Sequence, residues 1–191
     1  MSYLKIQIII YFIQKHMTKK KQKTLTTPFI KLQLMKYFRF DRNFIFVCSE
    51  CINKSDISAL NDSYLVEVEI KTSKTDFLRE FSGKSKNKTR KHIALNSGEK
   101  PHKNYIIPNY YYFCVTPELK DFVQEYLQEQ GLNKYGILVC NSKRIYGQKS
   151  HIYSVKTAKK IHNNPPSKTV YTKVSKRVQS ELISLKERLD G

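Results

Sequence analysis

The sequence is poor in cysteine, glycine and acidic residues, and these shortages exclude several classes of protein. Four cysteines in 191 residues are too few and too scattered for the disulfide framework of a small secreted domain, so we expect a reducing compartment. The six glycines form no glycine-rich phosphate-binding loop. The five histidines show neither H-x-E nor H-E-x-x-H spacing, which argues against a histidine-based metal enzyme.

Two of the cysteines have the spacing of zinc ligands, but the sequence lacks the further ligands that a structural zinc site needs. Cys48 and Cys51 have the spacing of a zinc-ligand pair, but no second close pair follows. Cys114 and Cys140 lie in apolar runs and are expected in the core.

Long hydrophobic runs are also absent. The most apolar stretch, residues 3–13, is interrupted by Lys5 and Gln7 and is shorter than the ~20 residues that a membrane span needs. A run of lysines follows it, where a signal peptide would have a small-residue cleavage site. We therefore expect a cytoplasmic protein with no signal peptide and no membrane span. Two alternatives stay open: a start at Met17, and a membrane-surface role for the basic residues of 1–23.

Positive charge dominates the composition. Thirty-five Lys and Arg against sixteen Asp and Glu give a net charge of +19, well above the roughly 2–8 units that keep a small domain soluble. This balance indicates a nucleic acid as the first partner. From Gln130 to Ser180 there is no acid, but there are eleven Lys or Arg with tyrosines interleaved. That pattern suits a phosphate-tracking surface, and a merely solvated face is the simpler alternative.

The hydrophobic pattern predicts one α/β domain. Residues 1–27 are expected to form a loosely ordered basic arm and residues 28–191 a single domain with a mixed sheet flanked by helices. The predicted order is αβββαβαβ, an antiparallel meander followed by strands joined through crossover helices. The expected helices cover 28–38 (with Thr27 as N-cap), 74–81, 117–130, 157–162 and 169–189. The expected strands cover 44–48, 55–60, 64–71, 110–115 and 135–140, with a short hairpin within 145–155. Residues 82–104 are polar and basic and are expected to form a loop, with a helical turn near 91–95 at most.

The second and third predicted strands form a hairpin that brings two acids together. Asn61-Asp62-Ser63 has the composition of a turn. If Leu60 pairs with Leu65, the register sets Asp56 opposite Glu69. Side chains opposed in this way lie ~5 Å apart at Cβ.

The third strand also separates polar from apolar residues. Its period of two places Glu67, Glu69 and Lys71 on one face and apolar residues on the other, toward a core. Five of the sixteen acids fall within residues 50–69. Carboxylates this close raise each other's pKa, and a divalent cation removes that penalty. Mg²⁺ takes one or two carboxylates, several waters and phosphate oxygens, which suits phosphodiester hydrolysis. A strand with a solvated polar face is the alternative.

These residues resemble a known family. Asp56, followed by Glu69-Ile70-Lys71, resembles the motif of the PD-(D/E)XK nuclease superfamily, with Ser55 in place of its proline. The segments 55–57, 67–73 and 76–77, and the later strands in 111–117 and 135–139, are similar to the MmcB-like DNA-repair branch.

The resemblance covers residues 28–162. It implies a restriction-endonuclease-like fold and Mg²⁺- or Mn²⁺-dependent hydrolysis of DNA, in DNA repair or in a phage or mobile-element context. It implies that Asp56 and Glu69 are metal ligands and that Lys71 is the catalytic lysine. The other implied or candidate members of the metal site are the Ile70 carbonyl, Glu50 as an additional acid, and Glu67.

Basic residues in two later segments are expected to contact the nucleic acid. They are Lys84, Lys86, Lys88, Arg90, Lys91, His92, Lys143 and Arg144. A non-catalytic nucleic-acid-binding protein of the same fold remains the rival hypothesis. The oligomeric state is open, a homodimer included.

Overall fold

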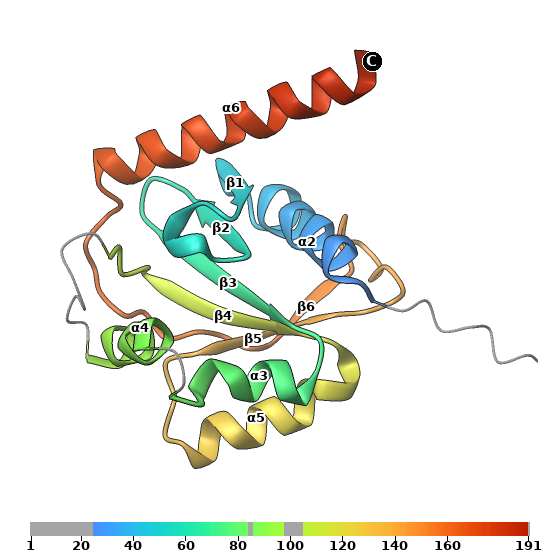
Figure 1. Cartoon of the computed structure of the whole chain (residues 1–191). Coiled ribbons are helices and arrows are strands. Elements are labelled where there is room, and N and C mark those ends of the chain that lie inside the picture. The colour runs from blue at the N-terminus through green and yellow to red at the C-terminus, as the bar shows by residue number, and fades with distance from the viewer. Residues whose placement is uncertain (1–24, 84–85, 98–104, 191) are drawn as a thin grey trace, which may run out of the picture.

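The computed structural model describes residues 25–83, 86–97 and 105–190, which form a mixed α/β fold (Figure 1). A six-stranded, mostly antiparallel open sheet is flanked by helices. The predictions for residues 1–24, namely the basic arm, the start at Met17 and the membrane-surface role, lie outside the described residues, as does Lys84. Within the described ranges, no helix has both the length and the apolar character needed to cross a bilayer.

The elements follow one another along the chain with short connections. The helices are α2 (Thr27–Lys36), α3 (Lys74–Phe81), α4 (Lys86–Ser97), α5 (Lys120–Glu129) and α6 (Lys168–Asp190). Short helical turns are the π-helix η1 (Tyr37–Asp41) and the 3-10 helices η2 (Ile52–Lys54) and η3 (Pro117–Leu119). The strands are β1 (Phe46–Ser49), β2 (Ile57–Leu60), β3 (Leu65–Lys71), β4 (Tyr110–Val115), β5 (Gly136–Cys140) and β6 (Ile152–Lys156).

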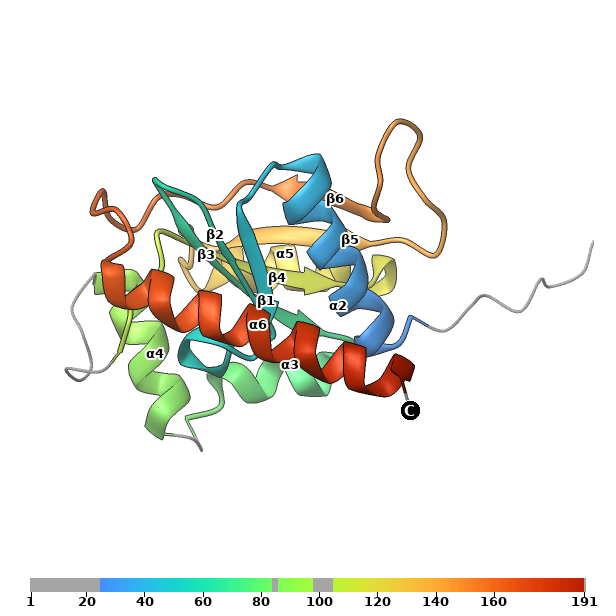
Figure 2. The ribbon, with the colours of Figure 1, turned by 90° about the horizontal axis from the view of Figure 1, so that it is seen from above.

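The strand order in the sheet is the order in the chain. β1, β2 and β3 form an antiparallel meander, β3, β4 and β5 are parallel, and β6 returns antiparallel to β5. Parallel neighbours need crossover connections, which α3 with α4 and then α5 supply. These three helices lie on one side of the sheet and α2 lies on the other, while α6 crosses the edge formed by β1 and β2 (Figure 1). Seen from above, α6 crosses β1 beside α2 (Figure 2).

Two apolar cores fill the spaces between these layers. In β5, Leu138 and Cys140 belong to the core under α2, whereas Ile137 and Val139 belong to the core under α3 and α5. β5 is therefore a continuous apolar run, because both of its faces are covered. Cys114 and Cys140 are fully buried, which confirms the core position predicted for them.

The predicted β2–β3 hairpin is confirmed in its register. Leu60 pairs with Leu65 and Ile57 with Val68, so Asp56 lies one position beyond the ladder, in line with Glu69. The turn is closed by the Asn61 side chain, whose Oδ1 accepts hydrogen bonds from the N–H groups of residues 63 and 64.

Residues 82–104 were predicted to be a loop, and this is wrong for residues 86–97, which form α4. The inward face of this helix carries Lys88, Lys91, His92 and Leu95, spaced for one helix face. Its lysines are paired with buried acids, so the helix is anchored by charge as well as by apolar packing.

Three other predicted elements also differ. The hairpin within 145–155 is wrong, because β6 pairs with β5 and residues 141–151 connect the two strands. The helix at 157–162 is wrong as well: this segment is held extended, with Lys159 donating to the Lys134 carbonyl and Ile161 to the Asn109 carbonyl. The N-cap of α2 is Thr26, whose hydroxyl accepts from the Phe29 N–H at 3.4 Å.

The C-terminal helix changes character along its length. Val170 and Val174 are buried against β1 and β2 in a third apolar cluster. Farther along, Leu182, Leu185 and Leu189 are exposed. The predicted helix over 169–189 is thus present, but only its first half is covered within the described part of the chain.

Candidate active site

The polar face of β3 is buried, not solvated. Glu67, Glu69 and Lys71 extend toward α3 and α4, with Glu67 fully buried and Lys71 only 4% exposed. The apolar residues between them, Val66, Val68 and Ile70, face a core, as predicted, and α2 covers that core. The alternative of an ordinary wet strand face is therefore wrong.

A buried glutamate on α3 organises the charges on this face. Glu80 is 1% exposed. Its Oε2 lies 2.9 Å from the Nζ of Lys71 and 2.9 Å from the Nζ of Lys88. Its Oε1 contacts Lys91 and lies 3.3 Å from His92 Nε2. One anion is thus surrounded by three lysines and a histidine.

The helix α3 brings Glu80 to this position for local reasons. The Ser73 hydroxyl caps the helix by accepting from the Asp76 N–H at 3.1 Å. Phe77 and Glu80 are three residues apart, so they share a helix face. Phe77 is fully buried in the core, and Glu80 is buried with it.

Lys91 on α4 joins this anion to the β3 acid. Its Nζ lies 3.2 Å from Glu69 Oε1 and 3.0 Å from the Tyr111 hydroxyl, in addition to its contact with Glu80. Next to it, His92 Nδ1 lies 2.8 Å from the Tyr135 hydroxyl. The network therefore links β3, β4, α3 and α4.

Asp56 lies at the edge of the network beside the end of β3. Its Oδ2 accepts a hydrogen bond from the Ile70 N–H at 2.9 Å. Its Oδ1 is 3.4 Å from the Nζ of Lys31 on α2, and the same ammonium is 2.7 Å from Glu50 Oε1. Glu50, the predicted additional acid, is thus linked to Asp56 through Lys31, and its own side chain is 59% exposed.

Burial and neighbouring charges shift the pKa values of the three glutamates in different directions. Burial raises the pKa of Glu67 to about 8. Burial also raises the pKa of Glu69, to which Glu80 and Asp56 add while Lys91 and Lys71 oppose. For Glu80, burial would raise the pKa, but the hydrogen bond from His92 and the charges of Lys91 and Lys71 outweigh it and hold the pKa well below its usual range.

The donor set suits a hard cation better than zinc. Asp56 and Glu69 offer two carboxylates, which the β2–β3 register sets in line with each other. Glu67 Oε2 is buried and has no hydrogen-bond partner among the described residues. Within the same ranges, no group of three or more His, Cys, Asp or Glu could hold a metal. An ion held by two carboxylates would keep water ligands, as Mg²⁺ commonly does.

The residues predicted to contact nucleic acid divide into three groups. Lys88, Lys91 and His92 take part in the Glu80 network, and the burial of Lys91 and His92 does not support direct phosphate contact. Lys86 and Arg90 are exposed on α4. Lys143 and Arg144 are exposed in the loop 141–151.

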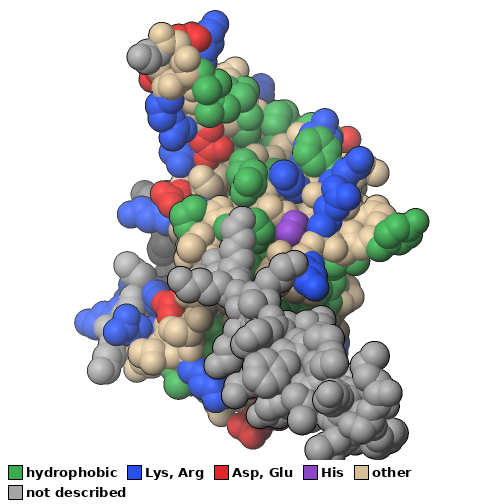
Figure 3. All heavy atoms as spheres, turned by 90° about the vertical axis from the view of Figure 1, so that its right-hand side faces the viewer, with side chains coloured by type: hydrophobic (Ala, Val, Ile, Leu, Met, Phe, Trp, Pro, Cys, Tyr) green, Lys and Arg blue, Asp and Glu red, His purple; other side chains and the backbone are tan. Residues whose placement is uncertain are grey.

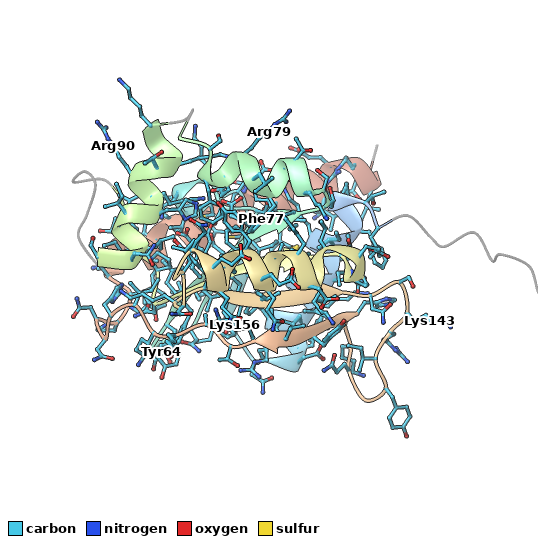
Figure 4. The ribbon with its side chains drawn as sticks, turned by 90° about the horizontal axis from the view of Figure 1, so that it is seen from below. Tyr64, Phe77, Arg79, Arg90, Lys143 and Lys156 are labelled. Atoms are coloured by element: carbon cyan, nitrogen blue, oxygen red, sulfur yellow. The ribbon has the colours of Figure 1, made fainter. Side chains whose placement is uncertain are left out.

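The two exposed groups lie on opposite sides of the molecule. Arg90 extends outward beside α4, whereas Lys143 lies toward the other side (Figure 4). On the side that carries the loop 141–151, Lys and Arg side chains predominate over Asp and Glu (Figure 3). The predicted contacts therefore do not form one continuous surface.

Sequence reasoning missed Glu80, Lys31, Tyr111 and Tyr135. A signal for Glu80 is present in the sequence, because it shares a helix face with Phe77. Each of the other three lies 19 or more residues along the chain from the side chains of the site that it hydrogen-bonds or pairs with, and no local pattern marks it.

Comparisons with known proteins support the fold and carry no function. No protein-family model matches the chain, and a search of curated proteins finds no match. The structure is similar to that of SPO1766, a protein of unknown function from Silicibacter pomeroyi, with a TM-score of 0.56 at 14% identity. The match covers 85% of this chain and 92% of that chain. At this identity the likeness shows the fold alone.

Proposed function

We propose that the protein is a Mg²⁺- or Mn²⁺-dependent nuclease of restriction-endonuclease-like fold that hydrolyses DNA phosphodiester bonds, in DNA repair or in a phage or mobile-element context. The observation that carries this proposal is the β2–β3 hairpin. It joins Asp56 to the Ile70 N–H and sets this acid in line with Glu69, whose neighbour on the same strand face is Lys71. A helix, a three-stranded meander and parallel strands joined by helices, in this order, support the fold assignment.

Each residue of the motif has a role in this proposal. Asp56 and Glu69 would hold the cation, with the Ile70 carbonyl as a further ligand. A cation held there would lower the pKa of a water ligand and would stabilise charge on the phosphate. Lys71, whose Nζ is 3.8 Å from Glu69 Oε2, orients the attacking water and neutralises the developing charge. Glu80 is a positioning residue, because it holds the Lys71 ammonium at 2.9 Å.

The proposal is tested by cleavage of supercoiled, linear and single-stranded DNA with Mg²⁺ or Mn²⁺. We expect Asp56→Asn to lower both activity and calorimetric Mn²⁺ binding. Lys71→Ala is expected to abolish cleavage and to leave DNA binding nearly intact. Losses of about 100-fold or more are typical for groups that stabilise charge in a transition state. Circular dichroism at the assay temperature checks that each variant is folded.

Glu118→Gln is the matched control, because this exposed acid lies outside the network. It should cleave like the wild-type protein. If folded wild-type protein cleaves none of the DNA forms with either ion, or if Glu118→Gln loses as much activity as Asp56→Asn, the nuclease assignment is wrong.

One observation favours the rival, a non-catalytic nucleic-acid-binding protein of the same fold. Lys71 is nearer to Glu80 than to Glu69, and Glu69 is already paired with Lys91 at 3.2 Å. The charged groups satisfy one another, as they would in a purely structural network. In that case DNA binding falls steeply with salt, ignores divalent ions, and is unchanged in Glu69→Gln.

A further inference from the structure

A second candidate site lies on the opposite face of the sheet from Glu69. A cavity of about 440 Å³ is bounded by the π-helix η1, the residues that follow it, the β2–β3 hairpin and β4. Val66 and Tyr110, which pair across β3 and β4, contribute to its wall. The volume is within the range of small-ligand pockets. Six aromatic side chains line it: Tyr37, Phe38, Phe44, Tyr64, Tyr110 and Tyr112.

The wall of this cavity is built from uncommon backbone that specific contacts hold in place. In η1, the Arg42 N–H donates to the Tyr37 carbonyl at 2.9 Å, a π-helical bond of a kind frequent at functional sites. Asn43 follows with φ 55°, in the left-handed region. The Asp41 carboxylate accepts from the Ser150 hydroxyl at 2.6 Å and from the Lys149 N–H at 2.8 Å. The loop 141–151 is thereby fixed to η1.

The tyrosine hydroxyls of the cavity point to a polar ligand. Within the described ranges, the hydroxyls of Tyr37, Tyr64, Tyr110 and Tyr112 make no hydrogen bond to the protein. Tyr37 is 7% exposed as a whole, and its hydroxyl is not one of the buried side-chain atoms without a partner, so this hydroxyl is open to whatever fills the cavity. The rings of Tyr64 and Tyr110 pack edge to face with their centroids 5.3 Å apart, and this contact holds each ring in one orientation.

Positive charge borders the same cavity. Arg42 lines it and is exposed. The Nζ of Lys160 lies 4.8 Å from the centre of the Tyr64 ring. Asp41 is the acid in the lining, and its carboxylate is engaged by the loop 141–151. Tyr64 and Lys156 lie on the side of the molecule away from Arg79 and Arg90 (Figure 4).

We propose that this cavity binds a nucleotide unit, with its base on the tyrosine rings and its phosphate on Arg42. Aromatic rings stack on any nucleobase, and a guanidinium pairs well with phosphate. The free tyrosine hydroxyls supply donors and acceptors for the edge of the base. The unit is either a free nucleotide or one nucleotide of a single strand. The site lies on the other face of β3 from the acidic cluster, so it does not depend on the nuclease proposal.

The probe is the 5′-monophosphate of 2-aminopurine deoxyribonucleoside, whose fluorescence is quenched on stacking. The chain contains no tryptophan to interfere. We expect saturable quenching that Tyr110→Leu and Arg42→Gln each weaken about tenfold or more. A single strand carrying 2-aminopurine forms the second arm. If only this strand responds to the two substitutions, the site takes a strand rather than a free nucleotide.

Tyr146→Leu and Arg79→Gln are matched controls, because both side chains are exposed and outside the cavity. They should bind the probe like the wild-type protein. Tyr64→Leu, at another tyrosine of the lining, repeats the test if Tyr110→Leu does not fold. Equal affinity in the cavity variants and controls, or no quenching by either probe at millimolar concentration, would overturn the assignment.

Discussion

The two faces of β3 are both buried, but they are stabilised in opposite ways. Val66, Val68 and Ile70 pack into the core under α2 by shape and apolar contact alone. On the other face, Glu67 and Lys71 are equally inaccessible and depend on polar partners, since Asn53 on η2 donates to Glu67 and Glu80 on α3 pairs with Lys71. Apolar packing therefore stabilises one face of β3, and hydrogen bonds and charge pairs stabilise the other.

The difference lies in how each face responds to a change. An apolar contact is lost in small steps as methyl groups are removed. A buried charge has no such gradation, because the removal of one partner leaves the other desolvated and unpaired. The charged face should therefore be the more fragile one, and the one whose stability depends on pH.

Glu80→Gln should have the largest effect on stability. The substitution keeps the size of the side chain but removes the anion that Lys71, Lys91 and His92 share. Breaking a buried charge pair in this way costs about 3–5 kcal/mol. Urea denaturation at neutral pH measures the free energy of unfolding.

Glu125→Gln on the exposed side of α5 is the control for that experiment. It should change the free energy of unfolding by less than about 0.5 kcal/mol. If both substitutions have equally small effects, the charged face contributes little to stability and the contrast between the two faces is lost.

Glu67→Gln should be more stable than the wild-type protein, and the difference in the free energy of unfolding should grow as pH rises. Burial raises the pKa of Glu67 to about 8 in the folded chain, against an ordinary value of 4.5. The folded state therefore retains a proton that the unfolded state loses, and wild-type stability falls between these two values. The slope is at most about 1.4 kcal/mol per pH unit. Glutamine mimics the protonated form, so the gain of the variant should grow from pH ~5 to pH 8 and then level off.

Unfolding midpoints of both proteins at several pH values between 5 and 9 measure this gain. Glu129→Gln, an exposed acid on α5, should follow the wild-type curve. A constant difference between Glu67→Gln and the wild type across this range would mean that Glu67 is ionised throughout.

The hairpin that carries the site could be predicted from local pattern. Alternation along β3 assigns each side chain to a face, and the Asn61 turn fixes the register that sets Asp56 in line with Glu69. Both signals act over a few residues, so the sequence contains all that is needed. Strands β4 and β5 could also be predicted from local pattern. Each is a continuous apolar run, because both faces of the sheet are covered there.

The burial of the charged face could not be predicted in the same way. Glu69 and Lys71 look solvated until α4 is known to cover them, and α4 itself looks like a loop because its inward face carries Lys88 and Lys91. The partners of those lysines come from β3 and α3. Such a helix is stabilised by contacts distant in sequence, which hydrophobic periodicity does not register.

On the apolar face, Ile70→Val tests whether stability falls in small steps as methyl groups are removed. Removing one methylene from this buried position should cost about 0.5–1.5 kcal/mol. Because no ionisable group is altered, the cost should be the same at pH 6 and pH 9. Chemical denaturation at the two pH values measures it, and a cost that differs between them would show that the two faces of β3 are coupled.

The smallest expected effect comes from Lys88→Met, and its value lies in comparison with Lys71→Met. Both ammonium groups are 2.9 Å from Glu80 Oε2, but the Lys88 side chain is 39% exposed and the Lys71 side chain 5%. Loss of the half-exposed pair should cost about 1 kcal/mol or less, and less still at high salt. Loss of the buried pair should cost about 3–5 kcal/mol at any salt concentration. Urea denaturation in low and high salt separates the two. Equal costs would mean that distance to the carboxylate, rather than burial, sets the strength of a charge pair on this face.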